Sequence, residues 1–432
     1  MRSPTVSTKL QRLATQAVDY PEEVFTNLAH LSDEEFLREA YHRTRKDSAP
    51  GIDRVTAQEY AEHLDENLRD LYERLRSGRY QAPPVERGWL DKEDGKKRPI
   101  GKPTVEDKIV QRAVAMLLGA IYEQDFQDFS YGFREGRSPH QALTELRAQC
   151  LGKTSHWIID ADIRGFFDSL DHDLLREVLR ERVKDGSILR LIGRWLKAGV
   201  SDGGDLTYPE AGSPQGGVIS PVLSNIFLHS VLDEWFVRDV QPRRQGRCFL
   251  LRFAADFVLG CEVEEDARRI MAVLPKRLAR FRLTLHPQKT RRIACGKPAR
   301  RETADTGNGT FELLGLTHYW AKSRLGNWVL KRKTARQRVR RAKQALWQGC
   351  RVNRPRPLKE QYQQLGQKLH GHYQYYSIRG NYRALESVCA VVRQAWRYGL
   401  SRRSRESYIP WDKFERLLEV FPLPRPKIIH QV

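Results

Sequence analysis

Two aspartates stand where apolar segments end, and this placement could support metal-assisted phosphoryl transfer. Asp162 lies at the end of an apolar run that begins at His156, and Asp256 follows the run Leu250–Ala255. A carboxylate at the end of a buried strand is costly unless it pairs with a cation. If the two strands are neighbours, both carboxylates would hold a pair of Mg²⁺ ions that clamp a hydroxyl and a triphosphate. The alternative, two unrelated surface acids, is disfavoured by the apolar strands beside them.

The second aspartate lies on a tight turn that lacks one acid. Residues 253–256 read Phe-Ala-Ala-Asp, between strands expected at about 247–253 and 257–263. An aromatic residue and two acids on such a turn would hold metal ions. Ala255 stands where the first acid would be, so the main metal ligand has been lost or removed.

Hydrophobic periodicity predicts the elements that position these residues. A strand is expected at 156–163 and a hairpin at 86–100, and Asp168 is expected to be structural, capping the helix after it. The order strand, helix, helix, strand, strand predicts a mixed sheet with helices on one face. Helices are expected at about 27–46, 56–77, 104–123, 171–184, 187–198, 219–237 and 265–281.

Composition favours a polyanionic partner. The chain has 432 residues and a formal net charge of +21, an excess typical of nucleic-acid-binding proteins. No apolar run is long enough to cross a bilayer, so no membrane association is expected. The six cysteines are scattered without a Cys-x-x-Cys pair, which predicts reduced thiols in a cytosol-like compartment and no zinc site.

The segment after about residue 320 is strongly basic. Residues 331–333 and the cations that follow are predicted to form one basic helix, and a further helical set is expected at 358–402 after prolines at 355 and 357. Like charges at helical neighbour spacing cost stability. A phosphate-facing role is therefore favoured over a solvated surface for Arg332, Lys333, Arg336, Arg338, Arg340, Arg341 and Lys343.

The order of motifs resembles that of the reverse transcriptases encoded by mobile group II introns, with their attached maturase domain. The resemblance covers roughly residues 30–420 and is specific. The matching segments are 48–53 (Ser-Ala-Pro-Gly-Ile-Asp), 98–104 with Asp107-Lys108, 129–138, 162–168, 213–221, 253–256, 285–290 and 311–315. Residues 365–404 resemble the maturase region, where Leu385, Val388, Val392 and Trp396 follow the spacing of a helix core.

The resemblance implies a role for each matching residue. The catalytic positions would be Asp162, Ala255 and Asp256, and the metal contacts Asp162, Ile163 and Asp256, with two Mg²⁺ ions expected and Mn²⁺ as an alternative. Phe167 matches the aromatic gate that excludes a 2′-hydroxyl, and the other nucleotide-binding positions would be Lys92, Arg98, Arg164, Gln215 and Gly216. Nucleic acid would be bound by Lys289, Arg332, Lys333, Arg336, Arg340, Lys343, Arg379, Arg402 and Arg403.

The implied fold is α+β: a right-hand polymerase with fingers and a palm on a mixed or antiparallel sheet, followed by an α-helical thumb or maturase domain. The expected divisions are an N-terminal helical extension at 1–64, fingers and palm at 65–320, and the thumb at 321–432. No Cys/His-rich or endonuclease-like segment is seen, so the resemblance is to members that lack a DNA endonuclease.

The implied function is an RNA-directed DNA polymerase and maturase of the bacterial cytosol or nucleoid. It would bind intron RNA, a template–primer duplex, target DNA and dNTPs, assist splicing, and copy RNA into DNA. Loss of the acid at Ala255 should nearly abolish polymerisation, and the intact motifs around it favour a deliberate substitution over natural decay. The alternatives are a related bacterial reverse transcriptase used in defence, repair or spacer acquisition, and a splicing cofactor that only binds RNA.

Overall fold

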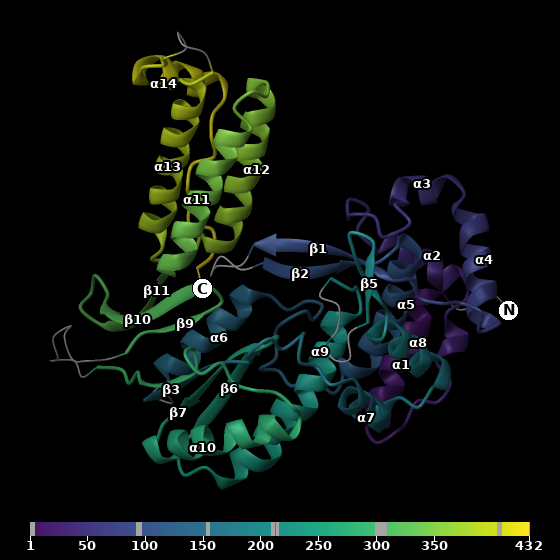
Figure 1. Cartoon of the computed structure of the whole chain (residues 1–432). Helices are drawn as coiled ribbons and strands as arrows, with labels where there is room; N and C mark the ends of the chain where they lie inside the picture. The colour runs from purple at the N-terminus through teal and green to yellow at the C-terminus, as the bar shows by residue number, and fades with distance from the viewer. Residues whose placement is uncertain are drawn as a thin grey trace. The chain divides into compact units, whose positions relative to one another are not determined.

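The computed structural model describes residues 5–91, 97–152, 156–208, 212, 216–298, 309–403 and 408–431, apart from the side chains of Asp91 and Arg98. The chain forms two compact units, each built from several segments (Figure 1). The first unit comprises residues 1–138, 161–258 and 265–291, and the second comprises 139–160, 259–264 and 292–432. The predicted divisions after residues 64 and 320 stay predictions.

The first unit is rich in helices with side-chain caps. Asp185 begins α8 by accepting hydrogen bonds from the main chain of Ser187 (2.8 Å) and Ile188 (3.0 Å), and its other oxygen accepts from Leu28 (2.6 Å) and Ala29 (2.9 Å). One buried carboxylate thus satisfies the ends of two elements. The helices are α1 (Val6–Asp19), the short η1 (Ala29–Leu31), α2 (Glu34–His42), α3 (Ala57–Glu62), α4 (Leu64–Arg76), α5 (Val105–Tyr122), α7 (His172–Arg182), α8 (Gly186–Leu196) and α9 (Ser220–Leu228).

A hairpin of β1 (Val85–Asp91) and β2 (Lys97–Lys102) belongs to a sheet with strand order β2-β1-β4-β5. β1 and β2 pair antiparallel, with Gly88 opposite Ile100. β4 (Val200–Asp202) joins β1 in parallel and β5 (Asp205–Thr207) in antiparallel orientation. The predicted hairpin at 86–100 is confirmed at these strands.

A second sheet has the order β6-β7-β3-β8. Its strands are β3 (Trp157–Asp162), β6 (Cys248–Phe253), β7 (Asp256–Cys261) and β8 (Arg291–Ala294). The six residues of β6 are buried or nearly so, as expected for a strand covered on both faces. Helix α10 (Glu264–Arg280) follows β7 along the chain. The predicted α+β class is confirmed by this combination of helices and sheets.

The second unit combines a small sheet with a helical bundle. The sheet has the order β11-β10-β9, from β9 (Phe311–Leu313), β10 (Leu316–Lys322) and β11 (Trp328–Thr334), and the unit also holds α6 (Pro139–Leu151). Helices α11 (Arg336–Val352), α12 (Leu358–Tyr376) and α13 (Tyr382–Leu400) lie side by side, followed by α14 (Trp411–Val420) (Figure 1). Their core includes Leu369, Leu385, Val388, Val392 and Trp396, which are fully buried.

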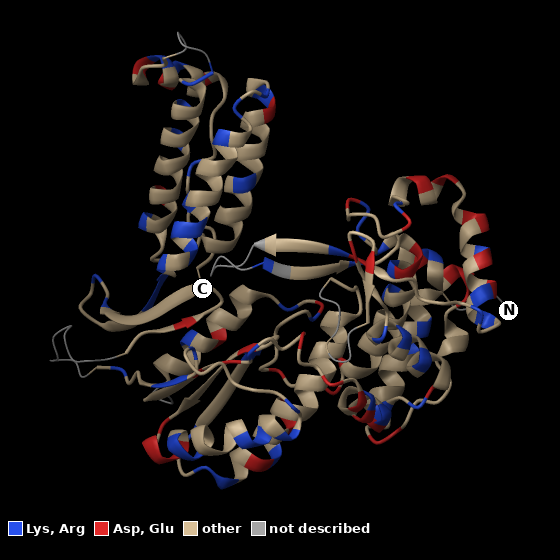
Figure 2. Cartoon of the chain, viewed as in Figure 1, with Lys and Arg blue, Asp and Glu red and all other residues tan. Residues whose placement is uncertain are grey.

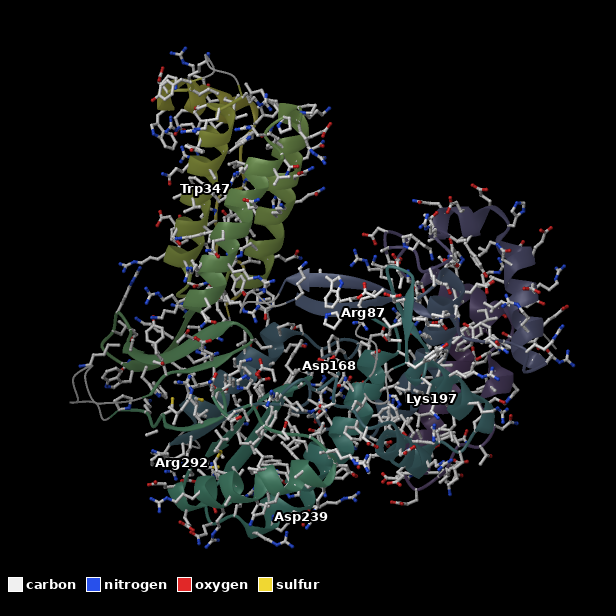
Figure 3. The ribbon with its side chains drawn as sticks, viewed as in Figure 1. Arg87, Asp168, Lys197, Asp239, Arg292 and Trp347 are labelled. Atoms are coloured by element: carbon white, nitrogen blue, oxygen red, sulfur yellow. The ribbon has the colours of Figure 1, made fainter. Side chains whose placement is uncertain are left out.

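Two predictions about local structure were wrong. Residues 331–333 belong to strand β11, because Trp328, Leu330, Arg332 and Thr334 alternate inward with a period of two. Asp171 caps α7 by accepting from Leu174 N (2.9 Å), whereas Asp168 lies in the turn before it (labelled in Figure 3).

The helix predicted at 219–237 changes its winding. After α9 it continues as two π-helical turns, η2 (His229–Asp233) and η3 (Phe236–Val240), and a short η4 (Gln241–Arg243). The wider turn alters which side chains face inward, and both His229 and Asp233 are buried.

All six cysteines are free thiols, and five of them are buried. Among the residues that the structure describes, no helix combines the length and apolar character that crossing a bilayer requires.

Candidate active site and its supporting network

Asp162 and the turn at 254–255 meet through the pairing of β3 with β7. His156 N donates to Cys261 O (2.9 Å) at the outer end of these two neighbouring strands. Counting the antiparallel register back along both strands places Ala161 opposite Asp256, so Asp162 lies level with Ala255, the turn residue that precedes β7. Directly opposed residues project to the same face of a sheet. An acid at position 255 would therefore share a face with the Asp162 carboxylate, and Ala255 supplies only a methyl group there.

The residues present do not fit the expected pair of Mg²⁺ ions. Among the described residues, no group of three or more His, Cys, Asp and Glu side chains could hold a metal ion. Asp162 instead forms an ion pair with Lys289, with Nζ 2.7 Å from the carboxylate oxygen, and both side chains are partly exposed. The ammonium group of Lys289 thus pairs with the carboxylate that would otherwise bind a metal ion. Asp256 follows Ala255 directly, at the start of β7, and its side chain is half-buried.

The segment around Leu285 explains why Lys289 reaches Asp162. His286 N donates to Asp162 O (2.8 Å) and Arg164 N donates to Thr284 O (2.8 Å), so residues 284–286 run antiparallel to the end of β3. Lys289 was predicted to bind nucleic acid, and its pairing with Asp162 places its side chain within the candidate active site.

The turn that carries Ala255 is tightly enclosed. Ala254 has φ +54°, an uncommon conformation for a residue with a side chain. Residues 129–131 run parallel to β6, with Tyr131 N donating to Arg252 O (2.8 Å) and Arg252 N donating to Phe129 O (2.9 Å). A Cβ atom at Gly132 would lie 2.3 Å from Ala254 N. The motif at 129–132 therefore needs glycine at its end, because the backbone passes directly against the turn.

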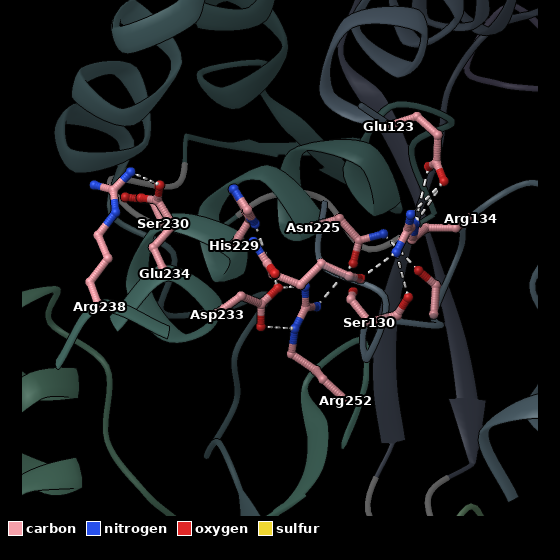
Figure 4. A network of polar contacts seen from close by, with 12 residues as sticks. Glu123, Ser130, Arg134, Asn225, His229, Ser230, Asp233, Glu234, Arg238 and Arg252 are labelled. Atoms are coloured by element: carbon pink, nitrogen blue, oxygen red, sulfur yellow. Dashed lines mark hydrogen bonds and ion pairs between the residues drawn. The ribbon is translucent and has the colours of Figure 1, made fainter. Parts of the chain in front are cut away.

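A buried polar network lies beneath the turn (Figure 4). Arg252, in β6, forms an ion pair with Asp233 of η2 in which both side chains are 0% exposed, with Nε–Oδ1 at 2.8 Å. Arg252 Nη1 also donates to Asn225 Oδ1 (3.1 Å) and to the main-chain oxygen of Ala254 (3.3 Å). Asn225 in turn donates to Gly132 O (2.6 Å). The network thus fixes both Ala254 in the turn and Gly132, which packs against it.

The charges in this network stabilise one another. Burial disfavours ionisation of Asp233, yet the adjacent guanidinium of Arg252 and its hydrogen bonds outweigh that effect and lower the pKa of the carboxyl group. A buried charge pair of this quality is rigid, because breaking it exposes either charge to an apolar environment. Sequence reasoning missed these residues, although one arginine within the apolar run of β6 was a visible signal.

The predicted aromatic gate has the exposure that such a role needs. Phe166 is buried and packs against Phe227, with ring centroids 6.5 Å apart. Phe167, T-shaped to Phe166 at 5.4 Å, is half-buried. A Cβ atom at Gly212 would lie 3.0 Å from the carbonyl oxygens of Phe167 and Asp168. Gly212 therefore packs against the backbone of Phe167 and Asp168.

Gly216 packs on the β1–β2 hairpin. Gly216 has φ +114°, and a Cβ atom there would lie 2.5 Å from Gly101 O in β2. Of the predicted nucleotide-binding positions, Gly216 thus lies against β2, the strand that contains Arg98. Arg164 is exposed after β3. Lys92 and Gln215 lie outside the described residues, as does the side chain of Arg98.

The N-terminal motif packs on the segment after β2. Lys108 Nζ donates to Ala49 O (2.6 Å) and to Ser48 Oγ (3.1 Å). A Cβ atom at Gly51 would lie 2.5 Å from Thr104 N. These contacts join two motifs that are distant in sequence into one support for the hairpin.

In the second unit, most of the cations predicted to bind nucleic acid are exposed. Arg336, Arg340, Arg379 and Arg402 are exposed, Lys333 is exposed beside Tyr319, and Lys343 is half-buried. Figure 2 shows Lys and Arg concentrated on the first turns of α11. Arg403 is exposed but donates to Arg354 O (2.9 Å) and Arg356 O (2.5 Å), which ties two loops together.

Arg332 does not fit the predicted role. Its side chain is 2% exposed, and Nη1 donates to Leu143 O (3.2 Å). It points inward because β11 alternates with a period of two, and it faces His318 across the β10–β11 pair. Its cationic group therefore lies in the core of the second unit. Arg332 is not among the residues that we propose to bind RNA.

Comparison with known proteins shows what the chain resembles. The chain is 38% identical over 231 residues to protein YkfC of Escherichia coli, which covers 52% of this chain and 61% of that protein. It is 36% identical over 227 residues to the group II intron-encoded protein LtrA of Lactococcus lactis, covering 51% of this chain and 37% of that protein. Over 96 residues it is 32% identical to nuclear intron maturase 1 of Arabidopsis thaliana, covering 22% and 13%. The chain thus spans less than two thirds of the length of these curated relatives.

The family model described as reverse transcriptase (RNA-dependent DNA polymerase) matches residues 90–318, more than half of the chain. This match includes Asp162, Phe167 and the turn at 253–256, and we conclude that the chain belongs to the reverse transcriptase family.

Proposed function

We propose that this chain is a group II intron-type reverse transcriptase and maturase whose present sequence cannot polymerise. It binds intron RNA, assists its splicing and, when the acid at position 255 is present, copies RNA into DNA. The observation that carries the proposal is the placement of Asp162 opposite Ala255, next to Asp256, at the end of two paired strands. The similarity to LtrA and to intron maturases supports the choice of RNA.

The proposed chemistry is nucleotidyl transfer assisted by divalent metal ions, which we take to be two Mg²⁺. Asp162, Asp256 and an acid at 255 would hold these ions, which neutralise charge on the triphosphate. Phe167 would select dNTPs by excluding a 2′-hydroxyl, and Lys92, Arg98, Arg164, Gln215 and Gly216 would contact the nucleotide. The template–primer duplex and target DNA would be further partners, in a bacterial cytoplasm.

Primer extension on an RNA template tests the proposal. We expect no cDNA from the chain as it is and Mg²⁺- and dNTP-dependent cDNA from the Ala255→Asp variant. Adding Asp162→Ala to that variant should abolish synthesis, because the second carboxylate of the pair is then lost. Ala254→Asp is the matched control: it adds the same charge one residue away, on the other side of the turn, and should stay inactive.

The outcomes separate the parts of the proposal. Activity that persists without Asp162 would contradict the assignment of the metal site. If Ala255→Asp stays silent in a folded protein, the polymerase assignment fails.

A binding-only splicing cofactor is the second candidate, and the Lys289–Asp162 ion pair favours it for the present sequence. Maturase activity needs an RNA-binding surface and no metal in the active site. The test is intron splicing with and without the chain under conditions where the RNA alone splices poorly. Stimulation by the unaltered chain would support the cofactor role, whereas a lack of stimulation with intact RNA binding would contradict it.

A further inference from the structure

An open cavity of about 490 Å³ lies in the first unit, away from the residues assigned above. It lies between η3–η4 and helix α10, and Trp235, Ile270 and Val273 supply its apolar lining. Asp239 on its wall is labelled in Figure 3, and Figure 2 shows the cations along α10. Six further lining residues are basic, and they are Arg243, Arg244, Arg269, Lys276, Arg277 and Arg280.

Few of these cations are neutralised by the protein. Arg243 pairs with Asp239 at 2.8 Å, and Arg269 pairs with Glu265 at 3.3 Å. The remaining acid of the lining, Asp266, already accepts hydrogen bonds from Gln245 N (3.0 Å) and Gly246 N (2.8 Å). Within the described parts of the chain, Arg244, Lys276 and Arg280 have no ion-pair partner. The cavity therefore has an excess of positive charge.

One of the cations is held in a fixed orientation. Arg277 donates through Nε to Val231 O (2.9 Å) and through Nη2 to Ser230 O (3.0 Å). Its guanidinium lies over the Phe281 ring, 4.7 Å from the centroid. A guanidinium fixed in this way loses little further entropy when an anion binds to its remaining N–H groups.

Size, charge and lining together indicate the ligand. A volume of about 490 Å³ is in the range of small-molecule sites and is too small for a duplex. The excess cations suit a phosphate, and the exposed Val273 surface, with Ile270, suits the face of a base. An acidic peptide would satisfy the cations, but short carboxylate side chains would leave the apolar lining in water.

We propose that this cavity binds one unpaired nucleotide of an RNA strand, with its phosphate at Arg244, Lys276 and Arg280 and its base over Ile270 and Val273. The choice of RNA as the strand rests on the proposed function. Unpaired bases are the usual target of proteins that recognise RNA by pocket binding. The site would anchor RNA on the first unit at a place distinct from the candidate active site.

Photo-crosslinking tests the site directly. A single-stranded RNA of about 12 nucleotides that contains 4-thiouridine is bound to the full chain and crosslinked, and the attached peptides are mapped by mass spectrometry. We expect crosslinks within residues 235–244 and 264–280, and none to a blunt duplex of the same sequence. Val273→Trp fills the cavity without changing charge and should reduce these crosslinks about tenfold, the value of one stacked base.

Charge reversal provides a second test with a matched control. Lys276→Glu with Arg280→Glu should lower crosslinking at the cavity by about tenfold or more, because phosphate contacts are lost. Arg180→Glu on α7 with Lys184→Glu just after that helix changes the net charge by the same amount at exposed positions outside the cavity. This control should change the crosslinks at the cavity by no more than about twofold.

Several outcomes would overturn the proposal. These are crosslinks that map only elsewhere, crosslinks unaffected by Val273→Trp, and equal losses in the two charge-reversed variants. If UMP or polyglutamate binds at the cavity while the RNA gives no crosslinks there, the ligand is a free nucleotide or an acidic peptide. This result would likewise contradict the proposal. The crosslinking experiment measures binding and not polymerisation. Its result therefore does not depend on whether the Ala255→Asp variant polymerises.

Discussion

At the scale of single residues, the proposed function makes position 255 the one that decides whether the site can polymerise. With a methyl group at 255, no acid there joins the Asp162 carboxylate, which pairs with Lys289 at 2.7 Å. A lysine with a flexible four-carbon stem can move away when a more highly charged cation competes for the carboxylate. Under the proposed function, the exchange of this one side chain would separate an RNA-binding protein from a polymerase.

Glycine at 132 is required by the closeness of the turn. The Gly132→Ala variant would push a methyl group into Ala254 N, 2.3 Å away, and the backbone must move to relieve that contact. We expect a loss of about 2–3 kcal/mol in the free energy of unfolding, as for other overpacked sites. Urea denaturation measures it.

Gly119→Ala is the control for this prediction. Gly119 lies within α5 with no atom near its missing Cβ, so alanine should stabilise the protein by up to about 1 kcal/mol. Equal effects of the two substitutions would show that the contact with the turn is unimportant.

At the scale of elements, β6 and η2 are joined by the Arg252–Asp233 pair. The pair connects the turn at 254–255 to a π-helical turn, so the irregular winding of η2 has a structural consequence: it allows Asp233 to face β6. This arrangement makes the turn a rigid part of the first unit.

Removing one partner of this pair should be costly. Arg252→Met leaves Asp233 buried without its cation, and we expect a loss of about 3–5 kcal/mol in unfolding free energy. Asp233→Leu in the same chain should recover much of that loss, because no charge is then stranded. Chemical denaturation of the two variants provides the measurement.

Arg238→Met tests the exposed pair with Glu234 in Figure 4, at 2.8 Å, and should cost less than about 1 kcal/mol. A loss at Arg252→Met as small as this control would contradict the role of the buried network.

The β10–β11 pair contains a histidine that should make the second unit sensitive to acid. Burial, with a smaller effect of Arg332, lowers the pKa of His318 to about 3. Its ring stacks on Phe311 with centroids 4.8 Å apart. Since the folded state lowers this pKa, the stability it contributes is complete above the ordinary value near 6.5 and is lost as pH falls toward 3.

The His318→Phe variant should therefore lose stability less steeply between pH 7 and pH 4.5. The difference should reach about 3 kcal/mol, from two pH units at about 1.4 kcal/mol each. Urea unfolding of the two proteins at both pH values measures it. His370→Gln, at an exposed position on α12, is the control. Parallel pH dependences for His318→Phe and the unaltered chain would contradict the prediction.

At the scale of the whole molecule, the net charge of +21 favours association with nucleic acid through many weak phosphate contacts. In the second unit, the exposed cations of α11 contribute to the positive surface charge. In the first unit, the cations around the cavity beside α10 contribute to it. Each unit thus presents its own basic surface, while the candidate active site lies within the first.

RNA affinity should fall steeply as salt rises. For single strands, the slope of log K against log salt is about 0.7 for each phosphate contacted. Arg336→Gln with Arg340→Gln should reduce that slope by about 1.4. Arg180→Gln with Lys184→Gln should leave it nearly unchanged. Fluorescence anisotropy over a salt series measures these slopes, and a flat response of the unaltered chain would contradict α11 as a binding surface.

The sequence by itself determined the family, the α+β class and most elements, because each depends on local signals. Motifs such as 162–168 and 253–256 are contiguous, and helices such as α5 and α10 follow from apolar periodicity and capping. The anomaly at Ala255 was also visible, because the surrounding motif was intact.

Only the tertiary structure decided which residues meet. Strand pairing placed Asp162 opposite Ala255, because register depends on both strands and not on either alone. The alternation of β11 turned Arg332 into the core, where a count of basic residues had predicted a helix surface. The Arg252–Asp233 pair and the basic cavity unite side chains from separate elements, and no pattern within one segment can reveal contacts that form only when those elements pack.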